Sequence, residues 1–235
     1  SFLNFLGKEI ASDYLNILHF DANRVHFVSG QNENGASSKV EEDGTTTIIL
    51  DGTIKDLFKM VHELTHCIYY QNFPVNKRPN NFNFLVEVNS ITMELLLYEF
   101  LIQNGYYTPD VCKFMNDRFR LFESYNGCFL FEMMLFRIVE KHKTLSKKLL
   151  NKYIDQAEDE LKPYFRYYRD NLKDIITYGF RFTTLNRYIS AILFACHLKK
   201  QIIEDKGQMS LLFRIGKGIY SDDLYDALNS GTINY

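Results

Sequence analysis

The stretch TIKDLFKMVHELTHCIYY, residues 53–70, contains the pattern that decides the fold of this chain. Its apolar residues recur every three or four positions, which is the spacing of one face of an α-helix. They are Ile54, Leu57, Val61, Leu64 and Ile68. Thr53 with Asp56 three residues later is similar to a capping box, so we expect the helix to begin there. Pro74 prevents its continuation much beyond Tyr70. The stretch therefore predicts one amphipathic helix.

Two histidines and a glutamate flank the apolar stripe of this helix. His62 and His66 are four residues apart, about 400° around and about 6 Å along the axis, so their imidazoles project from nearly the same face. Such a pair can bind one metal ion. Glu63 lies one position around, which keeps its carboxylate out of the ligand set but within reach of a metal-bound water, where a general base belongs. Because the pattern HExxH also arises by chance, the prediction needs a third ligand.

That third ligand is expected from a helix packed across the first, because two histidines leave zinc one protein ligand short. In LVEVNSITME, residues 85–94, Glu87 and Glu94 stand seven apart, two turns along one face of a largely apolar helix. Burying two carboxylates is costly unless positive charge holds them, and a metal with its histidines would do so. We expect Glu87 to be a ligand; the alternative for either glutamate is a solvated surface position. Zinc suits two imidazoles and one carboxylate, and manganese or cobalt could replace it in vitro.

Outward from this region the chain combines helices with a small β element. Residues 2–18 repeat apolar groups at helical spacing, whereas residues 24–28 and 45–50 alternate or are β-branched and predict two strands. The polar stretch 31–44 between them predicts a loop. We expect the β element to be antiparallel, and strand 45–50 could offer an edge to which an extended peptide adds.

The rest of the chain predicts helices. Their expected bounds are about 82–105, 108–143 with an interruption at Asn126-Gly127, 145–160, 163–177, 183–205, 208–215 and 221–229. No internal repeat or interdomain linker is visible. The fold class is therefore mainly α.

Charge and cysteine content narrow the classes of partner. The chain has 235 residues, 27 basic and 29 acidic, for a net charge of −2, so no global field draws it to nucleic acid or to an anionic membrane. Four scattered cysteines without a CxxC pair indicate reduced, buried thiols and favour a cytoplasmic location. No export signal or membrane-spanning run is recognisable. His19, His26, His142 and His197 lack ligand-like spacing and are expected to be surface or structural histidines.

Several segments in order resemble the catalytic region of the oligoendopeptidase F branch of the thimet oligopeptidase-like zinc peptidases. GTIKDLF, residues 52–58, precedes HELTH as a similar run does in that family. Tyr69-Tyr70, Pro74 and the run FLVEVNS, residues 84–90, followed by Glu94, resemble its Glu-x-x-Ser-x-x-x-Glu helix. YNGCFLFEMM, residues 125–134, is similar to its phenylalanine-rich second half.

The resemblance implies a helical zinc-peptidase catalytic domain over 1–235. Residues 1–52 would form the helix and β element, and 53–235 the helical zinc-binding part. Glu87 would be the third zinc ligand, and Glu94 would support the site from outside the ligand set. Three departures are visible: Thr65 stands where the family usually has glycine, the gap from His66 to Glu87 is a few residues shorter than in the family, and only 61 residues precede His62. The family's other channel wall is then an additional N-terminal lobe absent from this chain, or the chain is a minimal form with an open cleft.

The oxyanion donor is less clearly marked. In the family it comes from an aromatic-rich segment with a histidine, and residues 179–195 are similar to that segment. Tyr188 is our candidate, with Tyr178 or Arg181 as alternatives near the position of the family's histidine, which has no counterpart here. Tyr188 could equally be a half-buried packing tyrosine.

These observations lead to three functional expectations. The first is a zinc endopeptidase acting on short peptides, with Glu63 as general base. The second keeps the zinc but changes the substrate to a specific protein, because loss of the channel wall would remove a size filter. The third is an inactive relative that binds peptides, although nothing but chemistry requires Glu63.

Overall fold

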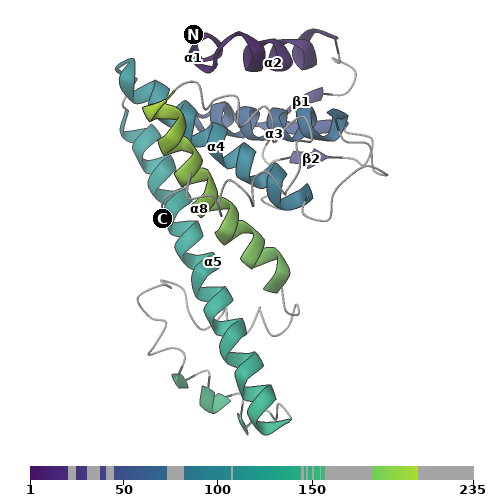
Figure 1. Ribbon diagram of the computed structural model, residues 1–235, viewed down its shortest axis with the longest axis vertical. Helices are drawn as coiled ribbons and strands as arrows, with labels where there is room; N and C mark the ends of the chain where they lie inside the picture. The colour runs from purple at the N-terminus through teal and green to yellow at the C-terminus, as the bar shows by residue number, and fades with distance from the viewer. Residues whose placement is uncertain are drawn as a thin grey trace. The chain divides into compact units, whose positions relative to one another are not determined.

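The computed structural model describes residues 1–20, 25–30, 38–40, 45–72, 82–106, 108–143, 146, 148–149, 151–153, 155–156 and 182–205. The described part is mainly helical, with one small sheet (Figure 1). The chain divides into two compact units, Ser1–Cys112 with Ala191–Tyr235, and Lys113–Ser190. The prediction of a mainly α protein is confirmed, whereas the zinc-peptidase fold and the single domain over 1–235 stay predictions.

The N-terminal helical segment is broken into two helices. α1 spans Phe2–Leu6 and α2 spans Lys8–Phe20, where the sequence predicts one helix over 2–18. Gly7 separates them with φ 87°, a left-handed conformation that glycine adopts without the penalty a side chain would bring. Apolar residues continue at helical spacing on both sides of Gly7, so their spacing alone does not predict the break between α1 and α2.

The β element is a three-stranded mixed sheet with the order β1-β3-β2. β1 (Val25–Ser29) and β3 (Thr46–Leu50) pair in parallel, so the antiparallel pairing expected of these two strands is not confirmed. β2 (Ser38–Val40) lies inside the stretch expected as a loop and pairs antiparallel with β3. Side-chain alternation predicts which face of a strand is buried but not its direction, and the long connection from β1 to β3 permits parallel pairing.

β3 is the central strand of this sheet and does not offer the free edge suggested by its sequence. It pairs with β1 from Thr46 to Leu50 and with β2 from Thr46 to Ile48. An extended peptide therefore cannot add alongside Thr46–Ile48 without displacing one of these strands. That hypothesis is wrong for this part of β3.

α3 (Lys55–Asn72) is the expected helix of the HExxH stretch, and it follows β3 directly. The expected capping box of Thr53 with Asp56 does not form, because the Thr53 hydroxyl donates to the Asp51 carboxylate instead. Asp56 still holds the start of the helix: its carboxylate accepts the backbone N–H groups of Asp51 at 2.9 Å and Gly52 at 2.7 Å. The Lys59 ammonium donates to the Ile49 carbonyl at 2.6 Å, which joins the first turn of α3 to the end of β3. The start of α3 is thus fixed to the sheet about two turns before the first histidine, His62.

α4 (Phe82–Gln103) packs against α3 and is buried around most of its circumference (Figure 1). Two contacts give the direction: His62 meets Glu94, and His66 meets Ser90, so the later residue of one helix faces the earlier residue of the other. The two helices therefore run antiparallel at the histidines. On the other side of α3, Thr65 accepts a short hydrogen bond from the buried Tyr14 hydroxyl of α2, 2.5 Å away, and itself donates to the Val61 carbonyl.

α5 (Pro109–His142) and α8 (Phe182–Glu204) are longer elements, and the first corrects an expectation. α5 passes through Asn126 and Gly127 without the predicted interruption. Gly127 is buried there, and a glycine inside a helix costs only about 1 kcal/mol, which packing can offset. The expected helices 163–177, 208–215 and 221–229 lie outside the described residues, and 145–160 is described only in part.

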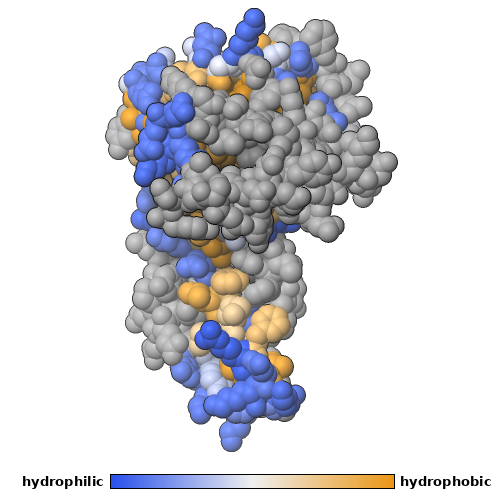
Figure 2. All heavy atoms as spheres, viewed as in Figure 1, coloured by the Kyte–Doolittle hydropathy of each residue, from blue (hydrophilic) through white to orange (hydrophobic). Residues whose placement is uncertain are grey.

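The second unit includes most of α5, which carries exposed apolar side chains. They are Phe119, Leu121, Phe136 and Val139. Figure 2 shows hydrophobic residues along the lower half of α5, above a hydrophilic end. Even so, among the described residues no helix combines the length and the apolar content needed to cross a bilayer.

Candidate metal centre

The two histidines of α3 direct the same ring nitrogen at each other. His62 Nε2 and His66 Nε2 form a hydrogen bond of 2.9 Å, and the ring planes are nearly perpendicular, at 87°. Spacing of four residues along a helix brings their side chains to one face, as the sequence predicts. His66 is 8 % exposed and His62 somewhat more, so the pair is largely removed from water.

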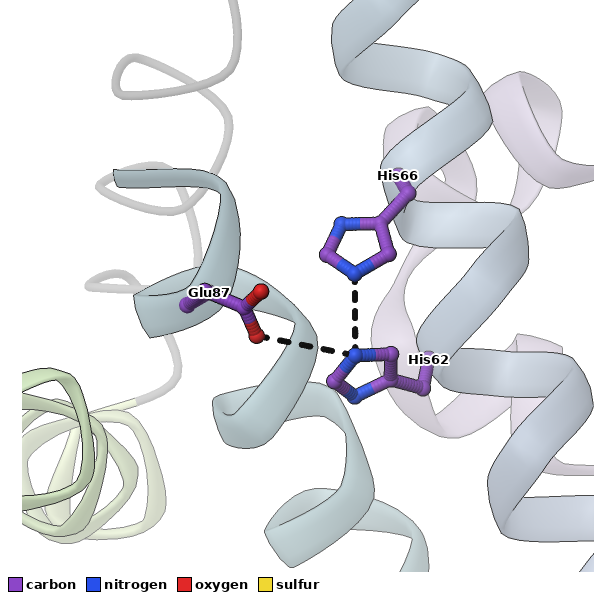
Figure 3. Close-up of side chains that lie close together, drawn as sticks. All are labelled: His62, His66 and Glu87. Carbon is purple, nitrogen blue, oxygen red and sulfur yellow. Dashed lines mark hydrogen bonds and ion pairs between the residues drawn. The ribbon is translucent and has the colours of Figure 1, made fainter. Parts of the chain in front are cut away.

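Glu87 completes this group from α4. Its Oε2 lies 3.7 Å from His62 Nε2, and the ligand atoms of His62, His66 and Glu87 all fall within 4.8 Å of one another. Figure 3 shows the Glu87 side chain turned toward the two imidazoles, with the carboxylate arriving from the neighbouring helix. The three residues could therefore hold one metal ion, as the sequence predicts for this set.

The spacing of these atoms can be compared with that of a bound metal. Ligand nitrogens about 2.0 Å from a tetrahedral zinc ion lie about 3.3 Å from each other. The nitrogen–nitrogen distance of 2.9 Å and the nitrogen–oxygen distance of 3.7 Å lie on either side of that value. Two of the separations among the ligand atoms are therefore close to the tetrahedral value, and the donor set of two imidazoles and one carboxylate fits zinc.

Glu94 binds His62 through Nδ1, the ring nitrogen that does not face His66. Its Oε1 is 2.5 Å from His62 Nδ1, and its side chain is 3 % exposed. A carboxylate accepts, so Nδ1 carries a proton. The protonated ring also donates from Nε2 to His66 Nε2, and loss of that second proton leaves Nε2 with a lone pair for a metal. The role that the resemblance implies for Glu94, support from outside the ligand set, is compatible with this contact.

The surrounding charges favour a cation at this position. Burial lowers the pKa of His62, but the carboxylate of Glu94, together with those of Glu63 and Glu87, raises it more, so the pKa lies above its usual value. Three carboxylates around one imidazole create a negative potential that a proton can satisfy in part and a divalent ion more fully.

Glu63 follows His62 on α3 and is 7 % exposed. It lies outside the group of ligand atoms, yet close enough to act electrostatically on His62. Its place in the chain, directly after the first histidine, is the one that the HExxH spacing predicts for a general base. The catalytic role of Glu63 stays a prediction.

Tyr188, the candidate oxyanion donor, lies on the part of α8 that belongs to the second unit. Its ring packs against Tyr125 at 5.7 Å between centroids, and the Arg187 guanidinium lies 5.3 Å from the ring. Tyr178 and Arg181 lie outside the described residues. The choice of oxyanion donor among them therefore stays a prediction.

The remaining histidines and the cysteines take other positions. His26 is exposed on β1, and His142 at the end of α5 lies 3.4 Å from the Tyr153 hydroxyl. Within the described residues, neither these two nor His197 belongs to a group that could hold a metal. Cys67, next to His66, points instead toward β3, where its thiol donates to Thr46 Oγ1, and burial raises its pKa to about 11.

Ser90 is a member of the site that sequence reasoning did not assign. Its hydroxyl oxygen lies 3.2 Å from His66 Nδ1. The signal was present in the sequence: Ser90 follows Glu87 by three residues and precedes Glu94 by four, so all three share one face of α4. A small polar residue on that face of a buried helix needs a partner.

Replacing Glu94 by glutamine tests how much the carboxylate behind His62 contributes. Gln can still accept from Nδ1–H but brings no negative charge, so we expect zinc affinity to fall by about tenfold, and by up to about 100-fold in Glu94→Ala. Glu99→Gln on the same helix, whose carboxylate pairs with Lys199 at 2.8 Å, serves as the control and should leave affinity unchanged. Competitive titration against a chromophoric chelator gives these values. Equal zinc affinities in Glu94→Gln, Glu94→Ala and Glu99→Gln would contradict a role for Glu94 in orienting His62.

Comparison with known proteins finds no match for this chain among protein-family models, curated proteins or solved structures.

Proposed function

We propose that this chain is a zinc-dependent endopeptidase that hydrolyses short peptides. The observation that carries the proposal is the convergence of His62, His66 and a Glu87 carboxylate oxygen, whose ligand atoms lie within 4.8 Å of one another, on a helix where the buried Glu63 follows His62. A structural ion pair would explain one histidine and one glutamate. It would not explain why a second imidazole, hydrogen-bonded to His62 Nε2 at 2.9 Å, and a second carboxylate, that of Glu87, converge on the same ring nitrogen.

The residues would divide the chemistry as follows. His62, His66 and Glu87 would hold the ion, which supplies a Lewis acid that polarises a carbonyl and lowers the pKa of a coordinated water. Glu63 would accept the proton of the attacking water and pass it to the nitrogen of the leaving amine as the peptide bond breaks. Glu94 would keep His62 in one tautomer through its bond to Nδ1.

The substrate class rests on the resemblance to the oligoendopeptidase F branch and on the charge of the chain. A net charge of −2 favours neither nucleic acid nor an anionic membrane as a partner. A zinc protease directed at one protein is the nearest alternative. A peptide-binding protein without activity is less favoured, because binding a metal or a peptide does not require Glu63 beside the ligand pair.

The proposal is tested by metal content and by cleavage of two kinds of substrate. We expect one zinc ion per purified chain by elemental analysis, and hydrolysis of quenched fluorescent peptides that stops with a zinc chelator and returns when zinc is restored. A peptide library and an unfolded protein digested side by side distinguish the substrate classes. Zinc binding without any peptide or protein cleavage would overturn the enzymatic proposal, and no zinc binding would overturn the metal centre itself.

A further inference from the structure

Ser90 lies on α4 between the two glutamates that the site uses. Its side chain is fully buried, at 0 % exposed, and its Oγ makes two contacts. One is to the Val86 carbonyl oxygen, four residues earlier on the same helix, at 3.0 Å. The other is to His66 Nδ1 on α3, at 3.2 Å. The hydroxyl therefore bridges the backbone of one helix and the imidazole of the other.

The direction of these two hydrogen bonds follows from the chemistry of the groups. A carbonyl oxygen can only accept, so Ser90 uses its single O–H proton on Val86. Toward His66 the hydroxyl then has only lone pairs to offer. The proton in the second bond must come from His66 Nδ1, and in the neutral ring this makes Nε2 the atom with the lone pair. That is the atom that lies 2.9 Å from His62 Nε2.

We infer that Ser90 is a positioning residue that fixes His66 as the Nδ1–H tautomer and so directs its Nε2 lone pair into the metal centre. The part of this inference that concerns metal affinity rests on the proposed function; the tautomer itself does not. His62 has its Nδ1 held by a charged carboxylate and His66 by a neutral hydroxyl. α4 therefore supplies, from a single face, one ligand and the outer partner of each histidine: Glu87, Ser90 and Glu94.

Local helix preferences give Ser90 no advantage at this position. Alanine is a better helix former than serine, and a fully buried hydroxyl must be matched by hydrogen bonds. A purely structural position in the middle of α4 would therefore tolerate alanine easily. If the hydroxyl serves His66, its removal takes away the acceptor that holds the proton on Nδ1 in this structure and weakens the preference for one tautomer.

Thr92 offers a matched control on the same helix. It is also fully buried, and its hydroxyl makes the same type of bond, to the Val88 carbonyl four residues back, at 2.6 Å. Two residues beyond Ser90 it points about 200° around the axis, away from the face that meets His66. Thr92→Val removes a buried hydroxyl with little change of shape, so it reproduces the structural loss of Ser90→Ala without touching a histidine.

The experiment compares wild type, Ser90→Ala, Ser90→Thr and Thr92→Val in the full chain. Long-range ¹H–¹⁵N spectra of the zinc-free protein report the tautomer of His66, whose signals are assigned by their loss in His66→Gln. We expect the Nδ1–H form in wild type, Ser90→Thr and Thr92→Val, and a mixture or the Nε2–H form in Ser90→Ala. Titration with zinc alone should show affinity about 10–100-fold weaker in Ser90→Ala and near wild type in the other two.

Each outcome bears on one claim. A His66 tautomer unchanged in Ser90→Ala, or an affinity loss equal to that of Thr92→Val, would overturn the role of Ser90 and leave the metal centre standing. Absence of zinc binding by wild type, together with a change of His66 tautomer in Ser90→Ala, would overturn the proposed function and leave the tautomer assignment standing. If Ser90→Thr fails to fold because its extra methyl group is not accommodated, the comparison of Ser90→Ala with Thr92→Val decides alone.

Discussion

Glu63→Gln is expected to lower kcat for peptide hydrolysis by about 10²–10⁴-fold, the range that a general base contributes, while the chain keeps its zinc. Glutamine has nearly the shape of glutamate, and Glu63 is 7 % exposed and outside the group of ligand atoms, so the site should stay intact. The amide cannot take a proton from water. The loss should therefore appear in kcat and in kcat/KM to a similar degree, because proton transfer belongs to the transition state.

Quenched fluorescent peptides give the rates, and elemental analysis of the same samples gives the zinc content. Glu99→Gln, far along α4 and paired with Lys199, controls for loss of a carboxylate elsewhere in the same unit. Wild type that binds zinc but cleaves no faster than Glu63→Gln would remove the claim that this chain is an enzyme.

The second large effect concerns the third ligand. In Glu87→Ala the proposed centre would lose one of its three protein ligands, so zinc affinity should fall by more than the roughly 10–100-fold that loss of an outer hydrogen-bond partner costs. We expect wild type to bind zinc most tightly, Glu94→Gln less tightly, and Glu87→Ala most weakly. This order distinguishes a direct ligand from a residue that acts through His62.

Thermal unfolding provides a second measurement of the same prediction. Zinc at about 100 times its Kd stabilises a folded protein by about 2.7 kcal/mol, so wild type should melt at a higher temperature with zinc than without it. Glu87→Ala should lose most of that rise, and Glu99→Ala should retain it. A zinc-dependent rise of equal size in Glu87→Ala would show that another group completes the site.

The structure follows the sequence most closely where contacts are local. The helix over residues 55–70 and the shared face of His62 and His66 depend on a period of 3.6 residues, which neighbours along the chain determine. Expectations that depended on distant partners fared less well. The direction of β1 against β3 and the insertion of β2 were not predicted, because strand alternation carries no information about the partner strand.

Two glycines also show that the sequence does not determine where a helix breaks. Gly7 breaks the first helical segment although the apolar pattern continues, while Gly127 sits inside α5 although it was expected to interrupt the helix. A glycine permits a left-handed turn but does not require one. Whether the turn forms depends on the packing of the flanking segments, and that packing is not readable from the residue itself.

For the candidate site, the sequence by itself determined the shared face of His62 and His66, the neighbouring Glu63 and the seven-residue spacing of Glu87 and Glu94, since each follows from helical geometry. Only the tertiary structure decided which ring nitrogens face the centre and which groups hold the rings. Those contacts join residues 24 and 32 positions apart, His66 with Ser90 and His62 with Glu94. They exist because two buried helices pack antiparallel with their polar faces in contact, and that arrangement depends on the burial of both helices at once.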